Sequence, residues 1–336
     1  MDRTPLARAA ARGDTAAQCM NQNPYTVRVG GMRSLEDALR EMPPELHIKI
    51  LPAGRALALN RTSKTTRMAI QKARVHAKIW TRSVFPEGLG LLENLNRLMA
   101  CCNVTVLGLS ICQLGEGGAR VMLEFLRLNT TLEKLFLASN NLGCDGARAL
   151  AEALCVNTTL RELQLSNNHM RDDGARALAD ALRSNTTLTS LCLGENELGE
   201  DGARALAEAL RSNTTLMELD LAENNVGDDG ARALAGALCV NTTLRKLDLS
   251  DNNVGDDGAR ALAGALCVNT TLHKLDFSYN EIGEGGVQAL TAAMIRNTTL
   301  MWLYFSYNEI GEGGVQALTA AMIRNTTLMW LYFDED

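Results

Sequence analysis

The sequence predicts an α/β solenoid, a curved stack of identical units that each contain one strand and one helix. The tetrapeptide NTTL occurs eight times, and every copy begins 28 residues after the one before, at Asn129, Asn157, Asn185, Asn213, Asn241, Asn269, Asn297 and Asn325. A fixed period of this size is typical of one supersecondary unit stacked many times. Each unit also joins an alternating apolar segment to apolar residues at helical spacing. Because a solenoid exposes a long curved face, the sequence favours a binding surface over a closed catalytic pocket.

Residues 1–100 do not fit the repeat. We expect a disordered tail over residues 1–23 and a basic N-terminal segment over residues 24–100 that includes the cap of the solenoid. The elements expected in it are helices over 34–40 and 63–82, a short strand over 46–51 and a capping helix over 91–100. The helix over 63–82 is basic and amphipathic, which favours a solvated cap helix; binding of calmodulin, an acidic membrane or RNA is the alternative.

The solenoid is expected over residues 101–336, where the pattern LxxLxLxxNxLGxxGARALAxAL recurs. The LxLxL section has the period of a strand. The section after it places Ala203, Leu206, Ala207 and Leu210 on one face of a helix. Asp or Glu lies at the start of most of these helices, where negative charge suits the positive end of the helix dipole. Identical units make all strands parallel, with the sheet on the concave side and the helices on the convex side.

Two asparagines in each unit have predicted structural roles. The Asn of LxxLxLxxN lies in a buried turn, where its amide can donate to and accept from backbone groups of neighbouring coils. It occurs at Asn140, Asn168, Asn196, Asn224, Asn252, Asn280 and Asn308, and Cys112 takes its place in the first copy. The Asn of NTTL is expected to end each helix in the left-handed conformation. The NTT segments are also formal glycosylation sequons, but the structural role is favoured because the start of the chain lacks a secretory signal.

The motif LxxLxLxxN/C, followed by a Gly-bounded Ala/Leu helix at period 28, resembles the ribonuclease-inhibitor-like class of leucine-rich repeats. This class includes the ribonuclease inhibitor, the Ran GTPase-activating protein and the sensor region of NOD-like receptors. The resemblance covers residues 101–333 and implies a horseshoe of eight full repeats and a final strand. It implies much less about function, because the class serves many partners.

Function is expected on the concave sheet, where the residues between the inward leucines face solvent. Three columns run across the repeats. The Asp220 column contains Phe136, Gln164, Cys192, Asp220, Asp248, Asp276, Tyr304 and Tyr332. The Lys274 column contains Lys134, Glu162, Ser190, Glu218, Lys246, Lys274, Trp302 and Trp330. The edge column contains Glu195, Glu223, Asp251, Tyr279 and Tyr307.

The centre of this face is therefore acidic and its C-terminal end is aromatic. Exposed Trp and Tyr are frequent hot-spot residues of protein interfaces. Together with the horseshoe resemblance, these residues predict a basic protein partner. The predicted contact set is Glu218, Asp220, Asp248, Asp276, Trp302, Tyr304, Trp330 and Tyr332.

A second explanation of this patch stays open. Residues 277–304 and 305–332 are identical, as are residues 224–244 and 252–272. The aromatic and acidic columns are therefore either selected contacts or by-products of duplication. Phe277, Phe305 and Phe333 replace leucines of the motif and are expected in the core.

Composition sets the remaining expectations. Residues 1–100 carry sixteen Lys/Arg and eight Asp/Glu, whereas the whole chain carries 33 and 39, so a basic head precedes an acidic body. This asymmetry suggests self-association or two classes of partner. We expect no transmembrane segment, a cytoplasmic location and reduced cysteines, with Cys112, Cys155, Cys239 and Cys267 behaving as buried thiols.

No catalytic, cofactor or metal motif is found, and the four histidines lie at unrelated positions. A non-enzymatic protein-binding module with no cofactor, no metal, no small-molecule substrate and no nucleic acid partner is expected. The alternatives are a GTPase activator resembling the Ran regulator, whose long acidic tail is matched here only by Asp334-Glu335-Asp336, and a cytoskeletal or structural scaffold. The chain end after the last strand suggests self-association there, an unusual cap or a truncated product.

Overall fold

The computed structural model describes residues 28–30, 74–78 and 103–333 of the chain. Eleven strands of these residues form one sheet in chain order. They are β1 (Arg28–Gly30), β2 (Arg74–Lys78), β3 (Asn103–Gly108), β4 (Lys134–Phe136), β5 (Glu162–Gln164), β6 (Ser190–Cys192), β7 (Glu218–Asp220), β8 (Lys246–Asp248), β9 (Lys274–Asp276), β10 (Trp302–Tyr304) and β11 (Trp330–Tyr332). From β2 onwards all neighbours pair in parallel, which confirms the predicted solenoid.

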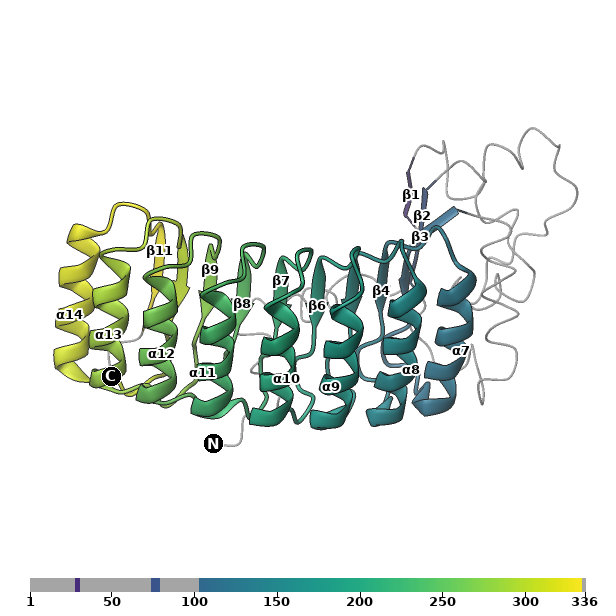
Figure 1. Ribbon diagram of the computed structural model, residues 1–336, viewed down its shortest axis with the longest axis horizontal. Helices are drawn as coiled ribbons and strands as arrows, with labels where there is room; N and C mark the ends of the chain where they lie inside the picture. Colours follow the sequence, from purple (N-terminus) through teal and green to yellow (C-terminus); the bar gives the residue numbers. More distant parts are fainter. Residues whose placement is uncertain (1–27, 31–73, 79–102, 334–336) are drawn as a thin grey trace, which may run out of the picture.

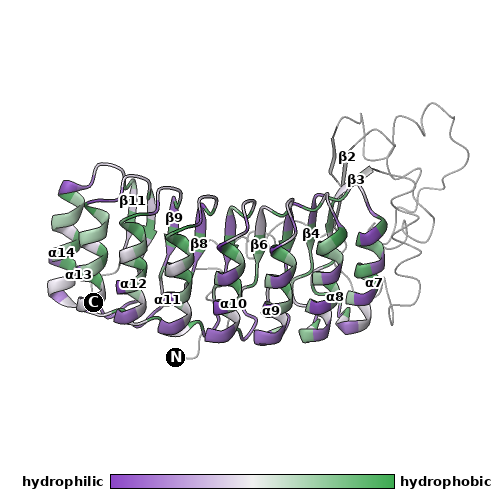
Figure 2. Ribbon diagram, in the orientation of Figure 1, coloured by the Kyte–Doolittle hydropathy of each residue, from purple (hydrophilic) through white to green (hydrophobic). Residues whose placement is uncertain are grey.

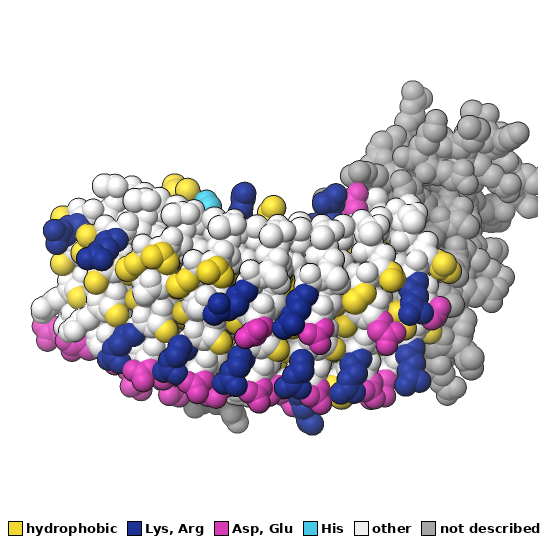
Figure 3. Space-filling model, viewed as in Figure 1, with side chains coloured by type: hydrophobic (Ala, Val, Ile, Leu, Met, Phe, Trp, Pro, Cys, Tyr) yellow, Lys and Arg dark blue, Asp and Glu magenta, His cyan; other side chains and the backbone are white. Residues whose placement is uncertain are grey.

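Eight helices of the described residues alternate with strands β3 to β11 and form a second layer against the sheet (Figure 1). They are α7 (Gly115–Leu128), α8 (Gly143–Val156), α9 (Arg171–Leu182), α10 (Glu200–Leu210), α11 (Gly227–Leu238), α12 (Asp256–Leu266), α13 (Glu284–Met294) and α14 (Gly311–Arg324). Each helix has a hydrophobic and a hydrophilic side (Figure 2). The outer face of the helical layer carries rows of basic and acidic side chains (Figure 3).

The core lies between the two layers and repeats with the sequence. In one unit Leu163 of β5 is 1% exposed, and Ala175 and Leu178 of α9 are fully buried. The phenylalanines that replace motif leucines follow the same rule, since Phe277 and Phe305 are buried and meet edge to face with ring centroids 6.3 Å apart. Phe333 is only partly buried, because it follows β11, the last strand of the described sheet.

The predicted helix over residues 63–82 is wrong where the structure describes it. Residues Arg74–Lys78 form β2, which pairs antiparallel with β1 and parallel with β3. The backbone groups on the open side of β3 need partners, and this requirement outweighs the helical spacing of apolar residues. The pairing is irregular, with a register shift between Val75 and His76. The other predictions for residues 1–100, including the tail and the cap helix, lie outside the described residues.

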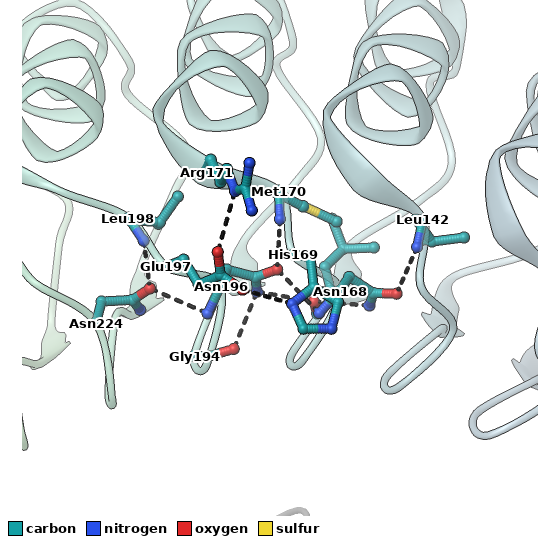
Figure 4. A network of polar contacts seen from close by, with 11 residues as sticks. Leu142, Asn168, His169, Met170, Arg171, Gly194, Asn196, Glu197, Leu198 and Asn224 are labelled. Carbon is teal, nitrogen blue, oxygen red and sulfur yellow. Dashed lines mark hydrogen bonds and ion pairs between the residues drawn. The ribbon is translucent and has the colours of Figure 1, made fainter.

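The asparagines of LxxLxLxxN form the predicted ladder through the turns (Figure 4). Asn196 is fully buried; its amide donates to Leu165 O and Leu193 O at 3.0 Å, and its own N–H donates to Oδ1 of Asn224 in the next repeat at 3.0 Å. In the first copy Cys112 is buried at the same position and donates its N–H to Asn140 Oδ1 at 2.9 Å. The side chain thus satisfies backbone groups of two consecutive coils.

The asparagines of NTTL form a second ladder, in a conformation that differs from the prediction. Asn157 is extended, with φ −76° and ψ 128°, rather than left-handed. Its Oδ1 accepts from the N–H groups of Thr159 and Leu160, and its amide donates to Leu126 O of the preceding repeat at 2.9 Å. Asn suits this position because of these hydrogen bonds, and not because it tolerates the left-handed backbone conformation. Because Asn157 is 4% exposed and its amide is bonded, the structural role of this sequon is favoured over glycosylation.

Acidic residues at the helix starts accept hydrogen bonds from the backbone of the following repeat. Asp228 Oδ1 accepts the N–H of Gly255 at 2.8 Å and of Gly258 at 2.8 Å, which satisfies the first turn of α12. The same two bonds join Asp172 to α10 and Asp256 to α13. Where the acid at this position of the preceding repeat is Glu, the glycine at the start of the next helix is left-handed instead. Gly227, which follows Glu200 by one repeat, is an example, and its N–H donates to Asn252 O of the next repeat at 2.9 Å. A difference of one methylene group accompanies the two turn conformations.

The cysteine prediction is correct for Cys112 and wrong for three others. Burial raises the pKa of the Cys112 thiol to about 11. Cys155, Cys239 and Cys267 are exposed, because they stand at helix ends beyond the last residue that packs into the core.

Candidate functional site

The strand register places the predicted concave residues in the expected columns. Tyr332 pairs with Tyr304, Tyr304 with Asp276, Asp276 with Asp248, and Asp248 with Asp220. In the Lys274 column Trp330 pairs with Trp302, and Glu218 pairs with Lys246. Because neighbouring strands lie about 4.8 Å apart, the four steps from β7 to β11 spread the contact set over about 19 Å. The structure therefore brings the set together as one band rather than as a point site.

The three aspartates at the centre of this band are held by their own chain. Asp220, Asp248 and Asp276 each accept the backbone N–H of the residue two positions later, at 2.9 to 3.0 Å. This bond fixes each carboxylate at the end of its strand. Removal from solvent raises the pKa of the Asp276 carboxyl to about 6, and the neighbouring Asp248 carboxylate adds to the rise. Consecutive carboxylates in one column thus create a local excess of negative charge.

A lysine of the chain already lies at the junction between the acids and the aromatics. The Lys274 Nζ atom is 4.0 Å from Asp276 Oδ2 and 4.6 Å from the centre of the Tyr304 ring. Carboxylates attract the ammonium group by charge, and the ring face attracts it through the quadrupole of the ring. This junction therefore has the chemistry to hold a cationic side chain.

Charges on the three concave columns do not cancel. Lys134 pairs with Glu162, and Lys246 pairs with Glu218 at 2.6 Å. In total the columns contain eight carboxylates and three ammonium groups. Three of these carboxylates belong to the edge column, where Glu195, Glu223 and Asp251 follow the strands with φ of 55° to 56°. The concave face is therefore acidic even after its internal ion pairs are counted.

Cys192 is the one member of the Asp220 column that the structure buries, with 8% of its surface exposed. Its thiol donates to Asp220 Oδ2 at 2.9 Å and lies 2.9 Å from the Ser166 hydroxyl. Burial is the largest cause of the raised pKa of this thiol, and the Asp220 charge adds to it. A protonated, buried thiol is a poor nucleophile, so Cys192 positions Asp220 rather than reacting.

The aromatic end consists of stacked rings in register. Tyr304 and Tyr332 stack with centroids 4.9 Å apart and planes at 2°, and Tyr279 and Tyr307 stack at 4.2 Å and 15°. Trp330 is 53% exposed, whereas Trp302, between two strands, is only partly exposed. Identical repeats thus occupy different environments, and the outer copy presents more aromatic surface to solvent.

One polar cluster was missed from the sequence. Glu197 accepts from His169 Nδ1 at 2.6 Å and from Arg171 Nε at 3.0 Å (Figure 4). These two hydrogen bonds, with that of His169 the larger, lower the pKa of Glu197. The three residues are exposed; His169 and Glu197 lie in equivalent turns of consecutive repeats, and Arg171 begins α9. The 28-residue offset of His169 and Glu197 was the signal that could have revealed the contact.

The convex face contrasts with the concave one because its charges alternate and pair. Arg204 pairs with Asp201 at 3.0 Å within α10. Arg260 pairs with Asp257 at 2.7 Å, and the same Asp257 lies 3.9 Å from Arg232 of the preceding helix. Figure 3 shows basic and acidic side chains, in blue and magenta, side by side in a row that crosses the helices. Exposed pairs of this kind contribute little stability and leave little net charge.

Within the residues that the structure describes, no group of three or more His, Cys, Asp or Glu side chains is arranged to hold a metal ion. Across the same part of the chain, none of the helices combines the length and apolar character that a membrane span requires.

Comparisons with known proteins agree with the architecture. The family model described as leucine-rich repeat matches seven segments, residues 128–151, 156–179, 184–207, 212–235, 240–263, 268–290 and 296–318. No curated protein matches the sequence at a significant level. Among solved structures, the leucine-rich repeat-containing protein LegL7 from Legionella pneumophila is similar, with a TM-score of 0.49 and 18% identity over 76% of this chain and 83% of that chain.

Two shorter structures are also similar. The structure of leiomodin-1 actin-binding site 2 is 26% identical, covers 44% of this chain and 86% of its own, and gives a TM-score of 0.40. The C-terminal domain of tropomodulin from Caenorhabditis elegans is 18% identical, covers 45% of this chain and 92% of its own, and gives a TM-score of 0.40. The matched family segments and the strand–helix architecture show that the chain belongs to the leucine-rich-repeat proteins, and its repeat motif resembles that of the ribonuclease-inhibitor-like class.

Proposed function

We propose that this protein binds a basic protein partner on the concave sheet, between β7 and β11. Leucine-rich-repeat arrays present such sheets as extended binding surfaces, which supports a protein-interaction module as the general function. The contact set is the predicted one: Glu218, Asp220, Asp248, Asp276, Trp302, Tyr304, Trp330 and Tyr332.

The position of Lys274 is the main support for this proposal. Its ammonium group lies between the Asp276 carboxylate and the Tyr304 ring, so the site is already complementary to a cation. A lysine or arginine of a partner would make the same two contacts by displacing Lys274, whose side chain is 33% exposed. Complementary charge across the band would also speed association and make it sensitive to salt.

The aromatic rings supply the second part of the interface. Trp330 and Tyr332 expose about half of their surface, and burial of such rings contributes a large share of binding free energy at interfaces. Trp330 stacks on Tyr332, and Tyr332 stacks on Tyr304. This stacking fixes the rings before a partner arrives, which lowers the entropy lost on binding. An anchored aromatic end beside an acidic centre favours a selected contact surface over a by-product of duplication.

Affinity purification from the native cell with quantitative mass spectrometry tests the proposal. The baits are wild type, Trp302→Ala/Trp330→Ala, Asp248→Asn/Asp276→Asn and, as a matched convex control, Asp201→Asn/Asp229→Asn. We expect a basic protein that both concave variants lose and the convex control retains. If all four baits recover the same proteins, the concave site is wrong.

The same purified chain tests the alternatives from the sequence. Acceleration of GTP hydrolysis by small GTPases would support the activator hypothesis, since a simple binding protein gives none. Co-sedimentation with large assemblies that survives both concave double substitutions would support a scaffold that uses another face.

A further inference from the structure

The outer face of the helical layer changes character between its two halves. At one helical position the first four helices carry carboxylates, and the last four carry Gly or Ala. The carboxylates are Glu124, Glu152, Asp180 and Glu208, and their equivalents are Gly236, Gly264, Ala292 and Ala320. A Cβ atom added at Gly264 would meet nothing within 4 Å. The C-terminal half is therefore smoother and less acidic than the N-terminal half.

Exposed apolar residues follow one another next to these small residues. We call them the convex stripe: Cys239, Val240, Cys267, Val268, Ile295 and Ile323. Val240 is 55% exposed, Val268 61% and Ile323 82%. Figure 3 shows hydrophobic side chains gathered over the ends of α11 and α12 and continuing towards α14. At the equivalent positions α9 and α10 carry Arg-Ser pairs, which separate the continuous stripe of the last four helices from the single exposed Cys155-Val156 pair of α8.

Two arginines mark one end of the stripe. Arg296 and Arg324 follow α13 and end α14, and both are exposed. Neither side chain has an ion pair with another described residue, unlike the arginines of the paired row lower on the same face. The surface thus combines an apolar stripe with positive charge at its C-terminal end, which is the opposite of the concave face.

The spacing of the stripe indicates what shape would cover it. Packed helices lie about 8–10 Å apart, so the stripe crosses four helices in about 24–30 Å. An α-helix of about 16–20 residues has this length, and two of its turns rise about 10.8 Å, close to the distance between neighbouring solenoid helices. One apolar residue in every seven would therefore meet one solenoid helix after another.

We propose that the convex stripe docks an amphipathic α-helix of a partner protein, with a heptad-spaced apolar face and carboxylates at the end that lies over Arg296 and Arg324. The small residues at Gly264, Ala292 and Ala320 let the partner helix approach closely, and the two arginines set its direction by charge. This inference concerns the face opposite the concave band and stands independently of the function proposed there.

The first test is thiol protection in the full wild-type chain. The probe is a synthetic helical peptide of about 20 residues with leucine at heptad a and d positions and glutamates at one end. Cys239 and Cys267 are exposed in the stripe, and Cys155 occupies the same repeat position outside it. Binding should slow alkylation of Cys239 and Cys267 by maleimide at least about threefold and leave Cys155 unchanged. Equal rates at all three thiols at a saturating peptide concentration, or protection of Cys155 as well, would overturn the proposal.

The second test measures peptide affinity by fluorescence anisotropy. Val240→Glu/Val268→Glu should weaken binding at least about tenfold, because two buried methyl pairs are lost and two like charges are added. Val156→Glu makes the same change outside the stripe and should leave affinity unchanged. Arg296→Glu/Arg324→Glu should lower the affinity for the peptide with glutamates at one end and raise the affinity for a version with lysines at that end. Equal affinity for the designed peptide and a scrambled one would overturn the proposal. So would dimerisation of the wild-type chain, measured by light scattering, or its binding to lipid vesicles, if the Val240/Val268 substitutions abolish either one.

Discussion

Asp228 in one repeat accepts the backbone N–H of Gly255 at the start of the next helix, at 2.8 Å. The bond joins the two repeats and leaves Gly255 extended, with φ −99° and ψ −162°. After a glutamate the equivalent glycine is left-handed, as Gly227 is with φ 59° after Glu200. Two helix-start geometries therefore occur along the solenoid, and the length of the acidic side chain one repeat earlier separates the extended glycines from Gly143, Gly227 and Gly311.

Asp228→Glu should lower the free energy of unfolding by about 1 kcal/mol although the charge is kept, because the longer side chain loses the two bonds to α12. Chemical denaturation measures the change. Asp229→Glu alters the neighbouring exposed acid, which pairs with Arg232, and should stay within about 0.5 kcal/mol of wild type. Equal effects of the two substitutions would contradict the role of the cap.

Asn196→Ala should lower the free energy of unfolding by about 2–4 kcal/mol. The substitution leaves the buried N–H groups of Asn168 and Met170 without their acceptor, Asn196 Oδ1, and each unsatisfied group costs about 1–3 kcal/mol. The exposed Asn225→Ala serves as control and should change stability little. Urea denaturation distinguishes the two, and a small effect at Asn196 would show that the ladder is not needed for stability.

Asp276 predicts a pH dependence of both stability and binding. Its folded pKa of about 6 lies above the ordinary value of 3.8, so the folded state holds the proton more tightly than the unfolded state. Stability should therefore fall as pH rises from about 4 to 6, by up to about 3 kcal/mol. Asp276→Asn should remove this slope and be more stable than wild type at pH 7. Thermal melts from pH 4 to 7 check this, with the exposed Asp201→Asn as a variant that keeps the slope.

The same titration should affect partner binding in the opposite sense to stability. Below pH 6 the protonated Asp276 no longer attracts a cation, so affinity for a basic partner should fall. Binding by Asp276→Asn should be weaker at pH 7 and should lose most of this pH dependence. Affinity of wild type that is constant from pH 5 to 7 would argue against Asp276 as a contact.

Trp302→Ala should cost more stability than Trp330→Ala, although the 28-residue units that contain them, 277–304 and 305–332, are identical. Trp302 lies between β9 and β11 and is partly buried, whereas Trp330 is 53% exposed on β11. We expect a loss of about 1–2 kcal/mol for Trp302 and less than about 0.5 kcal/mol for Trp330. Differential scanning calorimetry of both variants measures the difference. Trp330→Ala is thus the cleaner probe of binding.

The repeat period and apolar spacing predicted the solenoid, its parallel register and all three concave columns. They sufficed because each unit contacts only its neighbours, so one unit determines the stack. The same information could not predict the left-handed backbone of Glu195, Glu223 and Tyr279, each of which directly precedes a buried asparagine. Nor could it predict that Cys192 would be buried by Ser166 and Asp220, since that depends on three side chains from three repeats.

Local pattern failed where the neighbouring structure decided the outcome. Residues 74–78 have amphipathic helical spacing, yet they form β2 on the edge of the sheet. The asparagines of NTTL were predicted to be left-handed, yet Asn157 is extended because its amide reaches the preceding repeat. In both places a bond across repeats or strands outweighs the preference of the isolated segment.

Oxidative footprinting of the chain bound to its affinity-purified partner tests the central proposal most directly. Trypsin cleavage after Arg296 and Arg324 places Trp302 and Trp330 in different peptides, although their repeats are identical. We expect oxidation of both tryptophans to fall several-fold on binding, while Met322 of α14, 44% exposed, keeps its rate. Unchanged oxidation of Trp302 and Trp330 in a complex that forms would contradict a concave binding site.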